Sequence, residues 1–163
     1  HLKLVAAFTM LIDHIGASYV YNLILPSIQD DYAAYVMWNN IYDWMRLIGR
    51  VAFPLFCFFL VEGFFKTHNL KKHIAQMIIF SFISEIPFDM AIYNSFIYTY
   101  HQNVFFTLTI GLIALALIER WDNYLIKVIV AFAAIALVLV LKTDYDALGI
   151  ILILLFYILF KIG

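Results

Sequence analysis

Residues 125–141 read LIKVIVAFAAIALVLVL, a run in which Lys127 is the one charged side chain. A helix rises about 1.5 Å per residue and a bilayer core is about 30 Å thick, so a spanning helix needs about 20 mostly apolar residues. Five other stretches approach this length and character: Leu4–Leu25, Leu47–Phe65, Ile74–Tyr93, Val104–Ile118 and Ala147–Phe160. The sequence therefore predicts an all-α, polytopic transmembrane helix bundle of about six spans.

The composition of the whole chain supports this prediction. Apolar residues make up 66% of the chain and charged residues 13%, with a mean hydropathy of +0.95, whereas soluble domains have about 45–50% and about 25%. The formal net charge of -1 offers no basic excess for nucleic acid. No composition shift, internal repeat or low-complexity tract divides residues 1–163, so we expect one domain. Cys57 is the one cysteine and lies in an apolar run, which favours a packing role.

Charged residues fall unevenly between the predicted spans. One side of the predicted membrane receives the basic residues Lys3, Lys66, Lys71, Lys72, Arg120, Lys127 and Lys161. The other side receives Asp30, Asp31, Asp43, Asp144 and Asp146, against Lys142 and Arg46. By the positive-inside rule we expect both termini in the cytoplasm and a multi-pass protein of the inner (plasma) membrane. We expect the long connection Pro26–Met45, rich in Tyr, Trp, Asn and Asp, to lie along the membrane surface as a short amphipathic helix.

Several ionisable residues lie inside the predicted spans, where a charge costs about 2.5–3.5 kcal/mol and is by default a functional-site hypothesis. They are Asp13 and His14 in the first span, Arg46, Arg50 and Glu62 in the second, and Glu85 and Asp89 in the third. The two arginines are four residues apart, as are Glu85 and Asp89, so each pair shares a helix face. Pro87 lies between the two acids and predicts a kink. We expect Asp13, His14, Arg50, Glu85 and Asp89 to share one cavity.

Two interpretations of this polar set remain open. Arginine–carboxylate pairs can hold three helices together as structural ion pairs. His14 can hydrogen-bond a neighbouring helix, or it can act as a general base or proton shuttle, since its ordinary pKa of about 6.5 suits proton transfer. In the second case Asp13, or Glu85 or Asp89 from the third span, would orient the imidazole.

Other polar features carry a weaker signal. His101, Asn103 and Thr107 precede or open the fourth span and either line the same cavity or are solvated. The basic segment that contains Lys66, His68, Lys71, Lys72 and His73 either binds phosphates or reflects topology alone. Asp144 and Asp146 precede the last span and either cap it or add to the site. No HExxH, CxxC, P-loop or GxSxG pattern occurs, so we expect no metal site.

These stretches, in their order and spacing, resemble one known family. They are LKL at 2–4 with TMLIDHIG at 9–16, RLIGRVAFP at 46–54 with Glu62-Gly63 and Thr67, SEIPFD at 84–89, NVFFT at 103–107, and Asp144-Tyr145 with Gly149. The family is the TraX family, which includes the conjugative pilin acetylase and belongs to the transmembrane acyltransferase superfamily. Members of the family continue with further hydrophobic helices, so the resemblance implies either C-terminal helices after Gly163 or a shortened member whose cavity is open on one side.

The resemblance implies transfer of an acetyl group from cytoplasmic acetyl-CoA to an amine or hydroxyl acceptor, either a polypeptide amino terminus or a glycan. It implies His14 as the catalytic histidine, with Asp13 or Glu85 orienting it. The implied substrate-binding residues are Arg46, Arg50, Glu62, Asp89, Asn103 and Thr107, and the implied acyl-CoA-binding residues are Lys66, Lys71 and Lys72. The expected partners are the lipid bilayer, the donor and the acceptor, and no nucleic acid.

Two other classes of function use the same residues. A proton-coupled transporter or small channel also needs buried Asp, Glu, His and Arg in a relay. A non-catalytic membrane assembly factor would use the polar cluster structurally. An acyltransferase should be stabilised by acetyl-CoA, whereas a transporter should instead show flux that depends on a pH gradient.

Overall fold

The computed structural model describes residues 1–163, and it contains helices and one isolated bridge but no strand, which confirms the all-α prediction. All six predicted hydrophobic stretches are almost wholly helical. The chain divides into two compact units: residues 1–56 with 90–94, and residues 57–89 with 95–163. The expectation of one domain stays a prediction.

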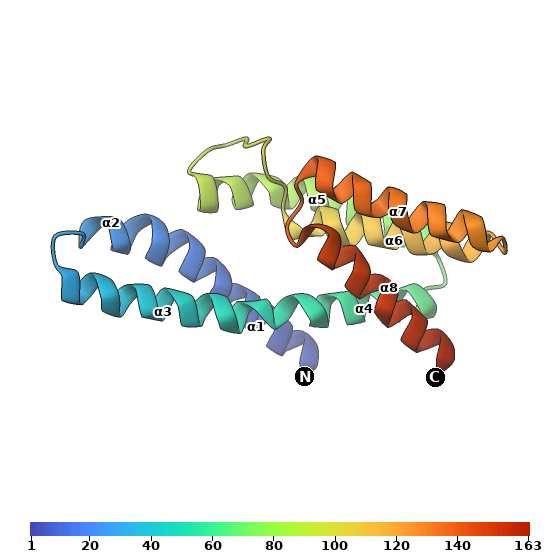
Figure 1. Ribbon diagram of the computed structural model, residues 1–163, viewed down its shortest axis with the longest axis horizontal. Helices are drawn as coiled ribbons and strands as arrows, with labels where there is room; N and C mark the ends of the chain where they lie inside the picture. The colour runs from blue at the N-terminus through green and yellow to red at the C-terminus, as the bar shows by residue number, and fades with distance from the viewer. The chain divides into compact units, whose positions relative to one another are not determined.

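The first unit is built on two antiparallel helical segments. The α-helix α1 (Leu2–Ile15), the π-helix η1 (Gly16–Ile24) and the short α2 (Leu25–Ser27) follow one another without a break. The helix α3 (Tyr32–Arg50) returns alongside them (Figure 1). Asp31 starts α3 because its Oδ1 accepts the backbone N–H of Ala34 at 3.1 Å, one of the donors that a helix start leaves without a partner.

The position of α3 corrects the prediction for Pro26–Met45. This segment is helical from Tyr32, but it packs lengthwise against the first predicted span and does not form a separate surface helix. After Val51 the chain continues as α4 (Ala52–Lys66), so the second predicted span is part of a nearly continuous helical stretch, Tyr32–Lys66. The composition of α3 is as polar as that of many loops. Its packing against α1 and η1 nevertheless stabilises the helical conformation.

Four helical stretches are long and apolar enough to cross a membrane: Leu2–Ser27, Tyr32–Lys66, Leu70–Tyr93 and Tyr124–Leu141. The third is α5 (Leu70–Tyr93), which continues through Pro87, and the fourth is α7 (Tyr124–Leu141). The helices α6 (Val104–Arg120) and α8 (Asp146–Ile162) have 17 residues each. Their length of about 26 Å lies at the short end of the spanning range.

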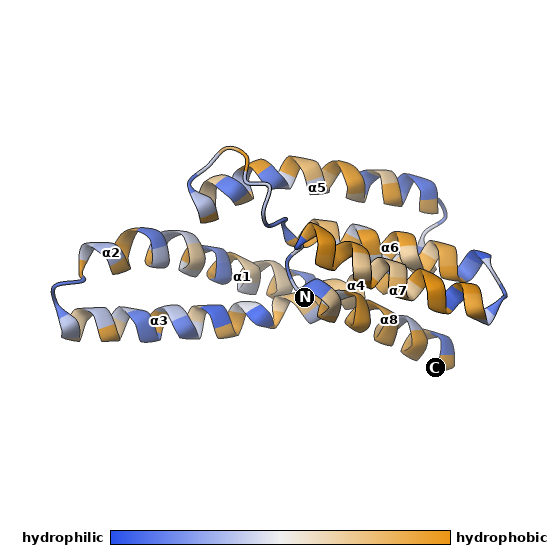
Figure 2. Cartoon of the chain, turned by 45° about the horizontal axis from the view of Figure 1, so that its top comes forward, coloured by the Kyte–Doolittle hydropathy of each residue, from blue (hydrophilic) through white to orange (hydrophobic).

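In the second unit α6, α7 and α8 pack against one another. Hydrophobic residues dominate α6 and α7, whereas α3 carries more hydrophilic ones (Figure 2). Ala114, Ala134, Val138 and Ile150 form a buried core between these three helices. A Cβ added at Gly111 of α6 would meet the side chain of Ile153 in α8, so a small residue permits this close approach, as is common between membrane helices.

A polar group lies at the end of α6, one residue beyond the predicted span Val104–Ile118. Glu119 accepts a hydrogen bond from the Tyr157 hydroxyl and pairs with Lys161, whose Nζ is 3.0 Å from its Oε2. The Tyr157 hydrogen bond, followed by Lys161, lowers the pKa of the Glu119 carboxyl below its ordinary value. The interaction ties α6 to α8.

This pKa shift predicts the pH dependence of stability. A carboxyl whose pKa is lower in the folded state stabilises the fold above the unfolded-state pKa of about 4.5. That stabilisation is lost as the pH falls through the folded-state pKa. The melting temperature of detergent-solubilised protein should therefore fall on acidification. In Tyr157→Phe this fall should be smaller, because the Glu119 carboxyl has lost the hydrogen bond that lowers its pKa. Identical pH profiles for the two proteins would contradict the role of Glu119.

A second prediction concerns the crossing of α1 and α3 at Gly49. A Cβ added at Gly49 would meet Cβ, Cγ and Oδ1 of Asp13, and Asp13 Cβ is held close to the backbone. Gly49→Ala should therefore lower the free energy of unfolding by about 1–3 kcal/mol, the usual cost of overpacking, and displace the Asp13 carboxylate. Thermal unfolding in detergent measures the effect.

Gly63→Ala provides the matched control for Gly49→Ala. Gly63 is also helical, and the nearest atom to its added Cβ is a ring carbon of His73 at 3.3 Å. The His73 ring must shift by about a few tenths of an ångström, and the higher helix propensity of alanine offsets this cost, so the variant should stay close to wild-type stability. A Gly49→Ala protein as stable as Gly63→Ala would contradict this prediction, because it would show that the contact between α1 and α3 accommodates an added Cβ.

Candidate functional site

The first polar cluster joins α1 to α3 within the first unit. Asp13 is 8% exposed, and its Oδ2 accepts a hydrogen bond from Nη1 of Arg46 at 2.6 Å. A charged hydrogen bond of this length offsets much of the cost of a carboxylate at membrane depth. The structure thus brings together two predicted site residues that lie on different helices.

His14 lies beside this ion pair. Its Nδ1 is 3.8 Å from Asp13 Oδ2, within ion-pair range but too far for a hydrogen bond. Nδ1 is buried and has no hydrogen-bond partner, although the side chain as a whole is 44% exposed. One edge of the ring therefore faces the carboxylate while another part stays accessible, as a proton-transfer group requires.

Arg50 does not join the cluster. It is exposed, it makes no ion pair, and Arg46 alone holds Asp13. The side chain of Arg50 is therefore available to an anionic ligand, and its predicted role in substrate binding stays a prediction.

The second polar cluster lies in the second unit, where α5 meets the start of α6. Oε2 of Glu85 accepts the backbone N–H of Asn103 at 3.1 Å and a hydrogen bond from its side-chain amide. Oδ2 of Asp89, a residue that is 1% exposed, accepts the backbone N–H of Tyr98 at 2.7 Å. Glu85 Oε1 and Asp89 Oδ1 are buried and have no partner. Since Glu85 belongs to the second unit, its role in orienting His14 stays a prediction.

Asn103 and Thr107 have structural contacts that account for both side chains. Asn103 Oδ1 accepts the N–H of Phe105 at 2.8 Å as the N-cap of α6, and its amide also donates to the Ser81 carbonyl at 3.0 Å. Thr107 is fully buried and its hydroxyl donates to Thr143 Oγ1 at 2.8 Å. The cap was recognisable in sequence, since an asparagine precedes an apolar helical run.

A basic groove of about 450 Å³ lies between the end of α4 and the start of α5. The residues that line it are Gly63, Lys66, Thr67, Asn69, Lys72, His73 and Gln76. Lys66 Nζ is also 2.7 Å from Oε1 of Glu62, which the sequence placed among substrate-binding residues. Lys71, a predicted donor-binding residue, is not in the lining, whereas Asn69 and Gln76 are lining residues that the sequence analysis did not single out.

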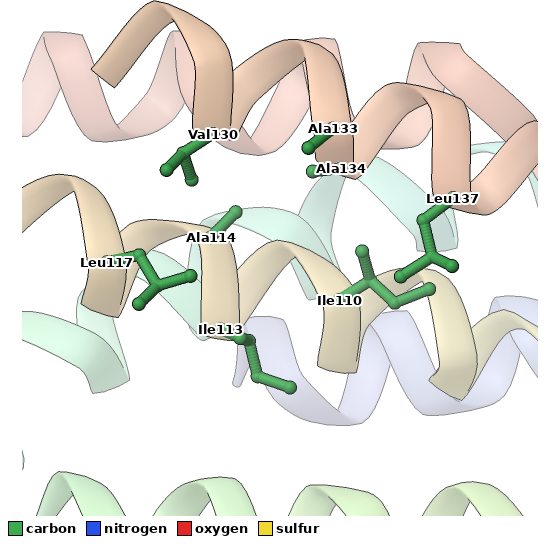
Figure 3. Close-up of a pocket in the computed structure, with 8 residues that line it drawn as sticks. All are labelled: Ile110, Ile113, Ala114, Leu117, Val130, Ala133, Ala134 and Leu137. Atoms are coloured by element: carbon green, nitrogen blue, oxygen red, sulfur yellow. The ribbon is translucent and has the colours of Figure 1, made fainter. Parts of the chain in front are cut away.

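A smaller pocket of about 190 Å³ lies between α6 and α7 (Figure 3). The side chains that line it come from Ile, Ala, Leu and Val residues of the two helices. Because none of these can bind a charge or transfer a proton, this pocket is not a candidate for the chemistry.

Comparison with known proteins agrees with the resemblance seen in the motifs. The family model described as "TraX protein" matches residues 1–162. The "Probable fimbrial assembly protein FimC, serogroup H1" of Dichelobacter nodosus is 35% identical over 102 residues, which is 56% of this chain and 41% of that protein. The match thus spans about two fifths of the relative. No solved structure matches the chain. Since the family model covers nearly every residue, the chain belongs to the TraX protein family.

Proposed function

We propose that this chain is an integral membrane acyltransferase of the inner membrane. It transfers an acetyl group from acetyl-CoA, on the cytoplasmic side, to an amine or hydroxyl acceptor such as a polypeptide amino terminus or a glycan. The observation that carries the proposal is the placement of His14 beside a carboxylate that Arg46 fixes within a pair of membrane-type helices. Family membership and the fimbrial-assembly name of the relative support it, since a fimbrial subunit is a polypeptide.

In the proposed reaction His14 is the general base. Its imidazole removes a proton from the acceptor as the acceptor nitrogen or oxygen attacks the thioester carbonyl carbon. The carbon–sulfur bond then breaks, and the leaving thiolate receives the proton from the imidazolium. Asp13, 3.8 Å away, stabilises the positive ring. Transfer through an acetyl-His14 intermediate would use the same residue.

The basic groove is the proposed donor site. Lys66 and Lys72 are the charged groups suited to the phosphates of an acyl-CoA, and His73 presents a buried Nδ1 that no protein group satisfies. Arg50, Glu62, Asp89, Asn103 and Thr107 remain proposed contributors to substrate binding, with Arg46 acting through Asp13.

The first test replaces His14 by alanine. We expect a fall of about 10²–10⁴-fold in acetyl transfer, the usual contribution of a general base, with normal membrane insertion. Purified protein in lipid membranes is incubated with labelled acetyl-CoA, and mass spectrometry follows the label to the protein, a polypeptide amine or a glycan. A transporter would leave the label on CoA.

His68→Ala is the control for His14→Ala, because His68 is exposed and does not line the basic groove. It should transfer acetyl groups at the wild-type rate. Full activity in His14→Ala would reject the proposed base.

The second test separates two neighbouring lysines of α5. Lys72 lines the basic groove and Lys71 does not, so Lys72→Ala should raise the KM for acetyl-CoA by about two- to fivefold with kcat unchanged. Lys71→Ala, the matched control, should keep the wild-type KM. Equal effects of the two substitutions would show that overall positive charge, not the groove, attracts the donor.

A further inference from the structure

The basic groove reaches from the connection between α4 and α5 some way along both helices. The connection joins two stretches that are long and apolar enough to cross a membrane, so it lies at the membrane interface. Gly63 lies three residues before the end of α4, and Gln76 lies six residues after the start of α5. At 1.5 Å per residue these positions are about 4.5 Å and about 9 Å along the helices. The groove therefore extends from headgroup level toward the apolar layer.

The chemistry of the groove changes with depth. Lys66 and Lys72 place ammonium groups near the connection, and Gln76 places a carboxamide, which can donate and accept hydrogen bonds, farther along α5. Three and four residues beyond Gln76, on the same helix face, Ile79 and Phe80 are each 56% exposed. Cation, amide and exposed hydrocarbon follow one another in the order in which a phospholipid presents its phosphate, ester and acyl chain.

The groove is open to a ligand that enters from the bilayer. Gly63 has no side chain, and a Cβ added there would lie 3.3 Å from the His73 ring, so the wall on α4 is low at this point. The helices α4 and α5 do not pack lengthwise against each other. A lipid can therefore reach the groove sideways without displacing a packed helix.

Two groups in the groove lack a partner for their polar atoms. Lys72 makes no ion pair, whereas Lys66 is paired with Glu62. The Nδ1 of His73 is buried and has no hydrogen-bond partner, and an imidazole N–H at this position can donate to a phosphate oxygen. Both residues lie in the first turn of α5, where the helix dipole favours an anion. The charges therefore complement a phosphodiester.

We propose that the basic groove binds an anionic phospholipid of the leaflet on the predicted cytoplasmic side, with the phosphodiester at Lys72 and His73 and the ester linkage at Gln76. Because the same lysines are proposed for the phosphates of acyl-CoA, the lipid competes with the donor. The anionic lipid content of the membrane then sets the apparent affinity for the donor. Lipid binding itself needs no transfer, whereas the competition rests on the proposed acyltransferase function.

The experiment measures lipid binding to the full chain in micelles of a neutral detergent. Native mass spectrometry follows titrations with dioleoylphosphatidylglycerol and with dioleoylphosphatidylcholine, which has the same acyl chains. The anionic lipid should bind more tightly, and Lys72→Ala should weaken its binding by about fivefold, the usual effect of one lysine at an anionic membrane surface. Lys71→Ala is the matched control, since Lys71 is also exposed but lies outside the groove. It should keep the wild-type affinity.

A second comparison tests whether the groove takes a lipid or any soluble phosphate compound. Glycerophosphoglycerol, the same headgroup without acyl chains, should displace the lipid only at a concentration higher by at least about tenfold. Gln76→Leu keeps both lysines and should weaken lipid binding by about two- to fivefold through loss of one hydrogen bond. Ala75→Leu, at an exposed position outside the groove, should have no effect.

Competition is tested by adding acetyl-CoA to the lipid-bound protein, which should release the anionic lipid. Equal binding of the two lipids, or equal effects of Lys71→Ala and Lys72→Ala, would overturn the inference. A headgroup that binds as tightly as the whole lipid would indicate a site for a soluble phosphate compound instead. Lipid and acetyl-CoA bound to the same molecule would reject the competition. Lipid binding that depends on Lys72, with no binding of acetyl-CoA under any condition, would keep the lipid site and reject the proposed function.

Discussion

A carboxylate inside an apolar helix needs a counter-charge, and in the first unit Arg46 supplies it to Asp13. The pair determines which residues of α1 and α3 lie at the same level, because a guanidinium reaches a carboxylate only over a short distance. Gly49, one turn after Arg46 on α3, provides the space for the Asp13 side chain. His14 is placed by this contact as well, since its ring lies next to the oxygen that Arg46 holds. Packing, charge compensation and the candidate base thus all depend on one interaction between two helices.

The carboxylates of the second unit where α5 meets the start of α6 follow a different rule, since neutral donors bind them. Asn103 caps α6 and donates to Glu85, and Thr107 donates to the segment before α8. These bonds connect helices that apolar contact alone would position loosely, because lipid provides little hydrophobic force between helices. Glu85 and Asp89 each keep one buried oxygen without a partner. Within this cluster these two oxygens are the atoms that can still accept a hydrogen bond from a ligand.

Hydrophobic runs were sufficient to predict the helical fold, and ordered motifs were sufficient to predict the family. The prediction was wrong where local composition and tertiary contact disagree: the polar residues of 32–45 resemble a surface segment, but the helix that they form packs against α1 and η1. The partner of Asp13 was not predictable either, because two arginines four residues apart satisfy the same pattern and the register between two helices is not encoded locally. The capping role of Asn103 was available from its position before an apolar run. The basic groove was predictable in part, since Lys66, Lys72 and His73 belong to the basic segment that the sequence offered for phosphate binding.

The electrostatics of the basic groove bear on how the proposed donor would be bound. A phosphate-bearing donor needs cations, and the proposed donor groove offers Lys66 and Lys72, of which Lys66 also pairs with Glu62. An ammonium acceptor must also lose a proton before its nitrogen can attack a thioester. His14 lies about one turn from Ser18, and no hydrogen bond occupies its Nδ1. In the first unit it is therefore the side chain best placed to take that proton, because its ring lies beside the carboxylate that Arg46 holds.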